Sequence, residues 1–308
     1  MKYGIKILLF ITLTLPITLM YSQANYCPEF MLLIQKYKSK SYNDAKLYLD
    51  TVLLKCPDQK NEAYYWHLSG FTYLDVYKYI DGKSPISKAR ETSINSFMES
   101  KKWDKTNKFT VHNDQALNIL ANTYYNDAAL ILQNEDTVNY ENAIVFYNQY
   151  KDLKKKIQPD YDFSEKDLSY NYVMGNIYKY KYENNKRYYR FYVDSSIICY
   201  NRALDIDSNH YETLYDLGIL YHNLGVDVIL NDLEVDADLE KVIIMQEKAI
   251  GYFSAALPYL KKIHGFKPTD EQIVQGIAAV YYSLNDMEKH VKYMDVLRDL
   301  KNQPPSNK

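Results

Sequence analysis

The chain has 308 residues, a net charge of −2 and a pI near 6.3, so its charge argues against a general nucleic-acid binder, which is usually basic. Hydrophobic residues make up 47%, which allows an extensive core and excludes a disordered chain. With 9 glycines and 9 prolines, the chain has fewer turn residues than a β-sandwich or a Rossmann enzyme of this length would normally need. Tyrosine is unusually abundant, at 34 residues.

Residues 1–24 have the layout of a secretory signal peptide. Two lysines precede an apolar run over residues 7–20, and Ser22 and Ala24 place small residues at a cleavage site. The run is shorter than the roughly 20 residues that span a bilayer, which favours cleavage over an uncleaved membrane anchor. A lipoprotein is a second alternative, but the residues before Cys27 lack a lipobox. The mature protein is expected to be exported to the periplasm, the cell surface or the medium, without a membrane span.

After residue 27, apolar residues recur with the spacing of one helix face. In segment 211–224, for example, Leu214, Leu217 and Tyr221 share a face. Strand-like alternation is hard to find, so the pattern predicts an all-α chain of about twelve helices joined by short turns. The expected breaks fall at residues 57–58, 81–85, 133–136, 159–160, 184–185, 208–209 and 268–270.

A repeated frame runs through these helices. A first helix carries a bulky residue, then Leu and Gly three and four positions later, and Tyr seven positions later. The second helix carries Ala-x3-Phe, and a proline near its end stops it. The small residue is needed where two helices cross closely. The small first-helix residues are Ser69-Gly70, Ala121, Gly175, Gly218 and Ala278, and the second-helix pairs are Ala45/Leu49, Ser93/Phe97, Ala143/Tyr147, Ser196/Tyr200 and Ala256/Leu260.

This frame resembles the tetratricopeptide repeat (TPR) family, here in an exported bacterial form. The resemblance implies a right-handed superhelical solenoid of about six antiparallel helix pairs, forming a single domain over residues 25–301. Some other array of helical hairpins is the alternative. Residues 302–308 are expected to be a disordered tail.

The spacing departs from the family in the middle of the chain. The family places the second-helix Ala nine positions after the first-helix Tyr. Here Ser93 comes 20 positions after Tyr73, and Ala256 comes 35 positions after Tyr221. We therefore expect lengthened central hairpins, with residues 226–248 forming a prolonged second helix and an acidic loop.

The same frame bears on the three cysteines. In an antiparallel pair, Cys27 at the start of the first helix would lie beside Cys56 at the end of the second. The resemblance therefore implies a disulfide that staples the N-terminal repeat, with two unrelated thiols as the alternative. Cys199 is expected to be a buried apolar filler. No cysteine and histidine set has the spacing of a metal site, so we expect neither a metal nor a cofactor.

The sequence contains no recognised catalytic motif. It lacks H-E-x-x-H, G-x-S-x-G, Walker A and G-x-G-x-x-G patterns. Acidic residues are abundant, and on amphipathic helices they ordinarily form a solvated face. A carboxylate pair that meets only in space stays an alternative, but the expectation is that the protein is not an enzyme.

In TPR proteins the first helices line a concave groove that binds peptides, and the resemblance places particular residues there. They are Tyr64, His67, Phe71, Asn118, Asn122, Tyr125, Tyr172, Asn176, Tyr180, Tyr215, Ile219 and His222, followed by Gln275, Ala279 and Tyr282 in the last pair. Asn122 and Asn176 are the leading candidates, because an amide can pair with an extended backbone and gains nothing from core packing. Some of the tyrosines are expected to pack between helices instead.

We therefore expect an exported protein–protein interaction scaffold or adaptor whose partner is another protein or a peptide segment. Nucleic acid is not expected as a partner, and homo-oligomers stay open. The alternative is a glycan- or peptidoglycan-binding protein with an aromatic groove, although only Trp66 and Trp103 could supply indole platforms. Segment 179–192 mixes five basic and six aromatic residues. It is either a surface for an anionic polymer or glycan, or the tip of a long hairpin.

Overall fold

The computed structural model describes residues 27–133, 139–186, 188–232 and 238–302. In this part of the chain all regular structure is helical, with twelve α-helices and no strand, which confirms the all-α prediction. The predicted signal peptide, residues 1–24, lies outside the described residues, as does the predicted tail except for Asn302.

The first six α-helices are α1 (Pro28–Lys38), α2 (Tyr42–Lys55), α3 (Ala63–Asp75), α4 (Lys88–Trp103), α5 (Thr110–Gln133) and α6 (Tyr140–Ile157). The others are α7 (Ser164–Asn184), α8 (Phe191–Ile206), α9 (Tyr211–Asp227), α10 (Leu239–Phe266), α11 (Glu271–Ser283) and α12 (Met287–Lys301). Three short helical turns are η1 (Pro57–Asn61), η2 (Val76–Ile80) and η3 (Val228–Asp232).

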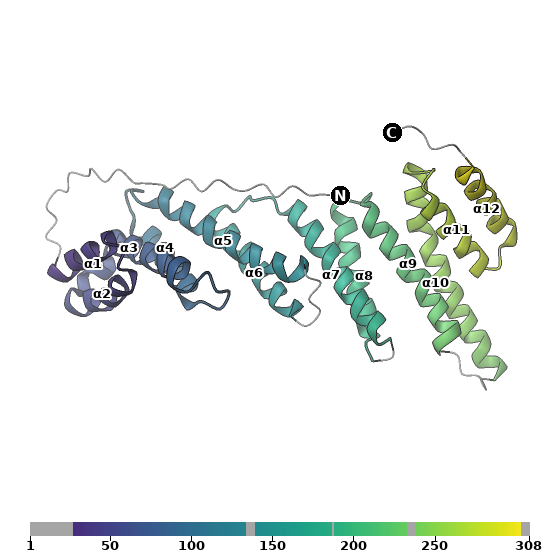
Figure 1. Ribbon diagram of the computed structural model, residues 1–308, viewed down its shortest axis with the longest axis horizontal. Helices are drawn as coiled ribbons and strands as arrows, with labels where there is room; N and C mark the ends of the chain where they lie inside the picture. Colours follow the sequence, from purple (N-terminus) through teal and green to yellow (C-terminus); the bar gives the residue numbers. More distant parts are fainter. Residues whose placement is uncertain (1–26, 134–138, 187, 233–237, 303–308) are drawn as a thin grey trace. The chain divides into compact units, whose positions relative to one another are not determined.

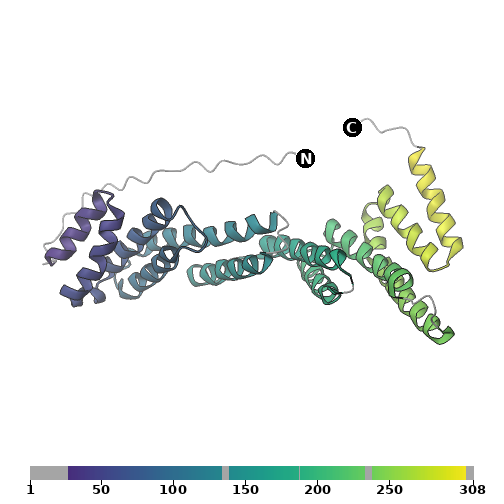
Figure 2. The ribbon, with the colours of Figure 1, turned by 60° about the horizontal axis from the view of Figure 1, so that its bottom comes forward.

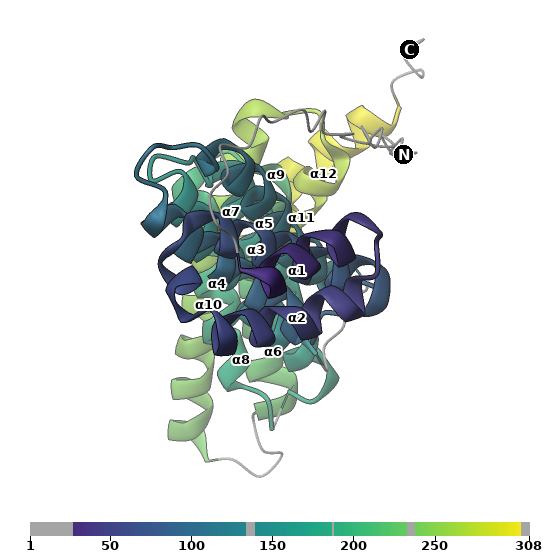
Figure 3. The ribbon, with the colours of Figure 1, turned by 90° about the vertical axis from the view of Figure 1, so that its left-hand side faces the viewer.

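The described residues divide into two compact units, and the boundary between Leu120 and Ala121 falls inside α5. In the first unit α1 packs on α2 and α3 on α4 (Figures 1 and 3). In the second unit α7 packs on α8, α9 on α10 and α11 on α12 (Figure 2). Ring contacts from Tyr124 to Phe146 and from Tyr125 to Tyr150 join the second half of α5 to α6. Consecutive helices therefore pair within each unit, whereas a single continuous domain stays a prediction.

The helices in the middle of the sequence are longer than those near its ends. The α1 and α11 helices have 11 and 13 residues, whereas α5, α7 and α10 have 24, 21 and 28. Residues 226–248 were expected to prolong a second helix, and α10 does begin at Leu239. Residues 228–232 add a π-helical turn to α9, while residues 233–237 lie outside the described part of the chain.

Glycine permits a close crossing between the two helices of three pairs. A methyl group at Gly70 would lie 2.6 Å from the Phe97 ring, and one at Gly175 would lie 2.5 Å from the Tyr200 ring. In the α9–α10 pair, Gly218 meets Leu260 in the same way, at 2.9 Å. These are the small and bulky positions of the repeated frame, so the frame describes real packing contacts within each pair.

Serine reinforces the crossing in two of these pairs. Where the frame expects alanine, Ser93 and Ser196 each donate a hydrogen bond of 2.8 Å, to the carbonyl oxygens of Gly70 and Gly175 respectively. Both serine side chains are fully buried. A buried hydroxyl without a partner would be costly, so these bonds explain why serine can replace alanine there.

Tyrosine and lysine side chains meet at aspartates in the second unit. Three aspartates each accept a hydrogen bond from a tyrosine hydroxyl and one from a lysine ammonium group. The sets are Tyr147, Lys151 and Asp167; Tyr172, Lys179 and Asp216; and Tyr182, Lys186 and Asp227. In each set the aspartate lies on the next odd-numbered helix, so the bonds tie successive pairs together. This arrangement gives part of the large tyrosine content a structural role.

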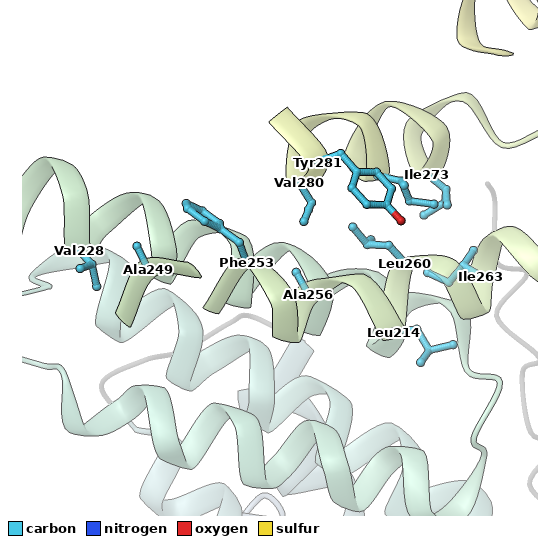
Figure 4. Packing of buried hydrophobic residues seen from close by; sticks show 11 residues of the cluster. Leu214, Val228, Ala249, Phe253, Ala256, Leu260, Ile263, Ile273, Val280 and Tyr281 are labelled. Atoms are coloured by element: carbon cyan, nitrogen blue, oxygen red, sulfur yellow. The ribbon is translucent and has the colours of Figure 1, made fainter. Parts of the chain in front are cut away.

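The largest core of the second unit is built around α10. Ala256, Leu260 and Ile263 are fully buried and lie beside Ile273 and Tyr281 of α11 (Figure 4). Burial of this kind contributes about 25 cal/mol for each Å² of apolar surface. The N-terminal end of α10 extends past α11 (Figure 1).

Candidate functional site

An open hollow of about 450 Å³ lies where α9, α11 and α12 meet in the second unit. Its lining residues are His222 from α9, Gln275, Ala279, Tyr282 and Ser283 from α11, and His290 and Met294 from α12. Four of these, at positions 222, 275, 279 and 282, were predicted to face the groove. Ser283, His290 and Met294 were not predicted. Ser283 falls outside the first-helix positions that the repeat frame assigns to the groove, and the other two lie on the second helix of the pair.

Hydrogen bonds fix the polar groups of this hollow. His222 Nε2 lies 3.1 Å from Ser283 Oγ, and His290 Nδ1 donates to the carbonyl oxygen of Ala278 at 2.9 Å. Burial lowers the pKa of His222, which keeps its imidazole neutral at pH 7. None of the lining residues is Asp, Glu, Lys or Arg, so the hollow offers hydrogen-bonding groups without a carboxylate, an ammonium or a guanidinium group.

Apolar surface accompanies these polar groups. The Tyr282 side chain is 63% exposed and Met294 is 42% exposed, so both are available to a ligand. Gln275 is exposed as well and carries both a donor and an acceptor. An exposed ring, a flexible thioether and an amide are suited to hold an uncharged side chain while pairing with a nearby main chain.

In the first unit, the predicted groove residues of α3 form an aromatic cluster. The Tyr64 ring stacks on Phe109 at 5.5 Å, and the His67 ring lies 4.6 Å from Phe109 and 4.9 Å from Phe71. His67 Nδ1 donates to Asn113 Oδ1 at 2.7 Å. Burial lowers the pKa of His67 to about 4, so this imidazole is neutral at pH 7. These side chains therefore have packing roles, and much of their surface is taken up by one another.

The predicted residues of α5 differ in their surroundings. Asn118 Nδ2 donates to the carbonyl oxygen of Asp114, one turn earlier in the helix, at 2.9 Å. Asn122 is exposed. The Tyr125 ring is half-buried, with Lys166 Nζ 3.9 Å from its centre. Of these three, Asn122 presents the most accessible polar side chain to a ligand.

The predicted residues of α7 and α9 take part in a hydrogen-bonded network. Asn176 Oδ1 accepts a bond of 2.5 Å from the hydroxyl of Tyr200, which is fully buried. The Tyr172 hydroxyl donates to Asp216 at 2.9 Å. Tyr215 stacks on a neighbouring tyrosine of α9 at 6.2 Å. The Asn176 amide thus has an internal role in the α7–α8 pair, which the sequence pattern did not indicate.

Cys27 and Cys56 lie at disulfide-bonding distance, with their Cα atoms 6.4 Å apart. The pair links the start of α1 to the end of α2, as the antiparallel frame implied. A carboxylate oxygen of Glu29 lies within 4.8 Å of both sulfurs, which groups three possible metal ligands. Sulfurs joined in a disulfide, however, offer no thiolate to a metal ion. Cys199 is buried, and burial raises the pKa of its thiol to about 11, so it is unreactive near neutral pH.

Segment 179–192 forms the tip of the α7–α8 hairpin, and its basic residues are engaged inside the second unit. Lys179 pairs with Asp216, Lys186 with Asp227 and Arg190 with Asp232, while Lys181 lies over the rings of Tyr140 and Tyr192. Residue 187 lies outside the described residues. With these charges neutralised by carboxylates, the segment is less suited to an anionic polymer than its composition indicated.

No helix in the described part of the chain combines the length and the apolar character that crossing a membrane requires. Comparison with known proteins adds no relative, since neither a family model nor a curated protein matches this chain.

Proposed function

We propose that this protein is an exported interaction scaffold of the TPR type, which binds a segment of a partner protein along the surface formed by its first helices. The observation that carries the proposal is the hollow between α9, α11 and α12. His222 and Gln275, from two consecutive first helices, line it together with Ala279 and Tyr282. The repeat frame had assigned all four to one face, so the pattern and the geometry support the same surface.

The chemistry of the hollow favours a peptide. A peptide main chain needs both donors and acceptors, which Gln275, Ser283 and the neutral His222 imidazole supply. Tyr282 and Met294 supply apolar contact area for a side chain of the partner. The lining has none of the lysines or arginines that a clamp for an acidic C-terminus requires. We therefore infer an uncharged segment as the ligand.

Two further features support the TPR assignment and export. The glycines of three pairs lie against the bulky residue that the TPR frame places on the second helix. The Cys27–Cys56 pair is compatible with an oxidising compartment, as is the signal-like pattern of residues 1–24.

Photo-cross-linking in the native envelope tests the proposal. Benzoyl-phenylalanine would replace Tyr282 at the hollow, or Ile198 on α8 as a control of comparable exposure, 63% against 51%. We expect a discrete protein adduct from position 282 and none from position 198. In the position 282 chain, Gln275→Ala with Met294→Ala should reduce that adduct by about tenfold, as expected for loss of two central contacts.

The other outcomes discriminate between the alternatives. The same adduct from both positions would show contact unrelated to the hollow and would refute the proposed site. Absence of a protein adduct, together with retention of the purified chain on peptidoglycan or glycan material, would replace the scaffold function with the carbohydrate-binding alternative.

A further inference from the structure

One side of the N-terminal half of α10 is apolar and bare. Leu239 is 74% exposed, Ile243 47% and Ile250 49%, and Gln246 between them is exposed too. Their spacing of four, three and four residues places all four on one side of the helix. We refer to Leu239, Ile243, Gln246 and Ile250 as the α10 stripe. The stripe lies on α10, whereas the hollow is lined by α9, α11 and α12.

Over its C-terminal half, the same side of α10 has α11 and α12 lying against it. Leu257 packs against the core that includes α11, and Lys261 Nζ lies 5.3 Å from the centre of the Tyr281 ring. Further along, the His264 ring lies 5.7 Å from Tyr293 of α12. The covering helices are short, with 13 and 15 residues against 28 in α10. Figure 1 shows α10 extending beyond them. The bare part spans about 17 Å, or three turns, and it continues a face that already packs against helices.

Charge distinguishes the two edges of the stripe. Glu240 and Glu247, seven residues apart and both exposed, follow one edge. On the other edge Val242 is half-buried and Ala249 is buried in the core that includes η3. A second copy of α10 on the stripe would bring glutamates near glutamates, which is unfavourable. A helix with lysine or arginine along its edge would instead complement them.

We propose that the α10 stripe is a docking surface for an amphipathic helix of a partner protein, with apolar residues at heptad spacing and basic residues along one edge. The partner helix would cover the N-terminal half of α10, as α11 and α12 cover its C-terminal half. Gln246, a polar group within the apolar seam, would pair with a polar residue of the partner and fix the register. This site is independent of the proposed peptide hollow.

Two designed helical peptides of about 16 residues test this proposal, a length that covers the bare three turns. Both carry leucine at the seam positions; one carries lysine along its edges and the other carries glutamate. Fluorescence anisotropy would measure their binding to the mature chain, residues 25–308. We expect the lysine peptide to bind about tenfold or more tightly than its acidic twin, with the preference shrinking in high salt.

Three variants of the chain locate the binding. Ile243→Lys with Ile250→Lys should abolish it, whereas Ile198→Lys, an equally exposed isoleucine on α8, should leave it unchanged. Glu240→Lys with Glu247→Lys should reverse the preference between the peptides. All substitutions are at exposed positions, and circular dichroism checks that each variant is folded.

Equal binding of both peptides, no binding of either, or an unchanged preference in the charge-reversed chain would overturn the proposal. So would self-association of the wild-type chain in sedimentation velocity that Ile243→Lys abolishes, because the occupant would then be a second copy. The cross-linking result at Tyr282 does not depend on any of these outcomes, so the two proposals fail separately.

Discussion

Replacing Gly175 by alanine should destabilise the second unit, even though alanine is the better helix former. The added methyl group would lie 2.5 and 2.6 Å from two carbons of the Tyr200 ring. That ring has no room to withdraw, because Tyr200 is fully buried and its hydroxyl is held by Asn176 at 2.5 Å. The helix backbone of α7 or the packing of α8 must therefore move.

The magnitude follows from two opposing contributions. Alanine in place of glycine inside a helix gains about 1 kcal/mol. Overpacking a well-packed core costs about 1–3 kcal/mol, and the rigid, fully buried Tyr200 ring sets this site near the upper end. We expect a net loss of about 2 kcal/mol in the free energy of unfolding for Gly175→Ala. Gly251 on α10 has no atom within 4 Å of such a methyl group, so Gly251→Ala should instead stabilise the same unit by about 1 kcal/mol.

Urea unfolding followed by circular dichroism measures both variants in the transition of the second unit. A double variant, Gly175→Ala with Tyr200→Leu, should lose less than the sum of the two single losses, because the smaller side chain relieves the contact. Equal stabilisation by Gly175→Ala and Gly251→Ala would refute the close crossing of α7 and α8. Strict additivity in the double variant would show that Tyr200 is not the obstacle.

Three further predictions concern other contacts. Cys27→Ser with Cys56→Ser should lower the stability of the first unit by about 3–4 kcal/mol, from the entropy of a loop with sequence separation 29; an unchanged first-unit transition in urea would contradict the link. Asp227→Ala should destabilise the second unit by about 2–4 kcal/mol, because it leaves the buried Tyr182 hydroxyl without its acceptor. Tyr182→Phe should cost a similar amount, and the double variant Asp227→Ala with Tyr182→Phe should lose less than the sum of the two single losses. Fully additive losses would contradict the role of this hydrogen bond. The pKa of His67 is about 4 in the folded chain and near 6.5 in the unfolded chain. Neutral, buried His67 therefore contributes to the free energy of unfolding above pH 6.5, and this contribution is lost as the pH falls towards 4. Urea unfolding of the first unit at pH 7.5 and 4.5 should show a loss of roughly 2–3 kcal/mol that His67→Gln reduces, and an equal loss in that variant would assign it to other groups.

Local spacing was enough to predict the helical pairs. The spacing of Gly175 and Tyr200, and of the equivalent residues in other pairs, predicted which residues meet at each helix crossing. Two helices joined by a short turn can pack in few ways, so this spacing along the chain is enough. The same logic predicted that Cys27 and Cys56 would meet, since both lie at one end of a single antiparallel pair. Four of the residues that line the hollow were also predicted, because the resemblance to the TPR family implied that one face of the first helices lines a groove.

Contacts between pairs were decided only by the tertiary structure. The sequence suggested that the Asn176 amide was free for a ligand, yet Tyr200 donates to it. One of its two interpretations of residues 179–192 was a basic surface, yet Asp227 and Asp232, some 40 residues later, neutralise Lys186 and Arg190 there. The exposure of the α10 stripe could not be predicted from the sequence either, because the spacing of its apolar residues is that of a buried helix face. Whether such a face is covered depends on the reach of other helices, and in α10 the short helices α11 and α12 cover only its C-terminal half.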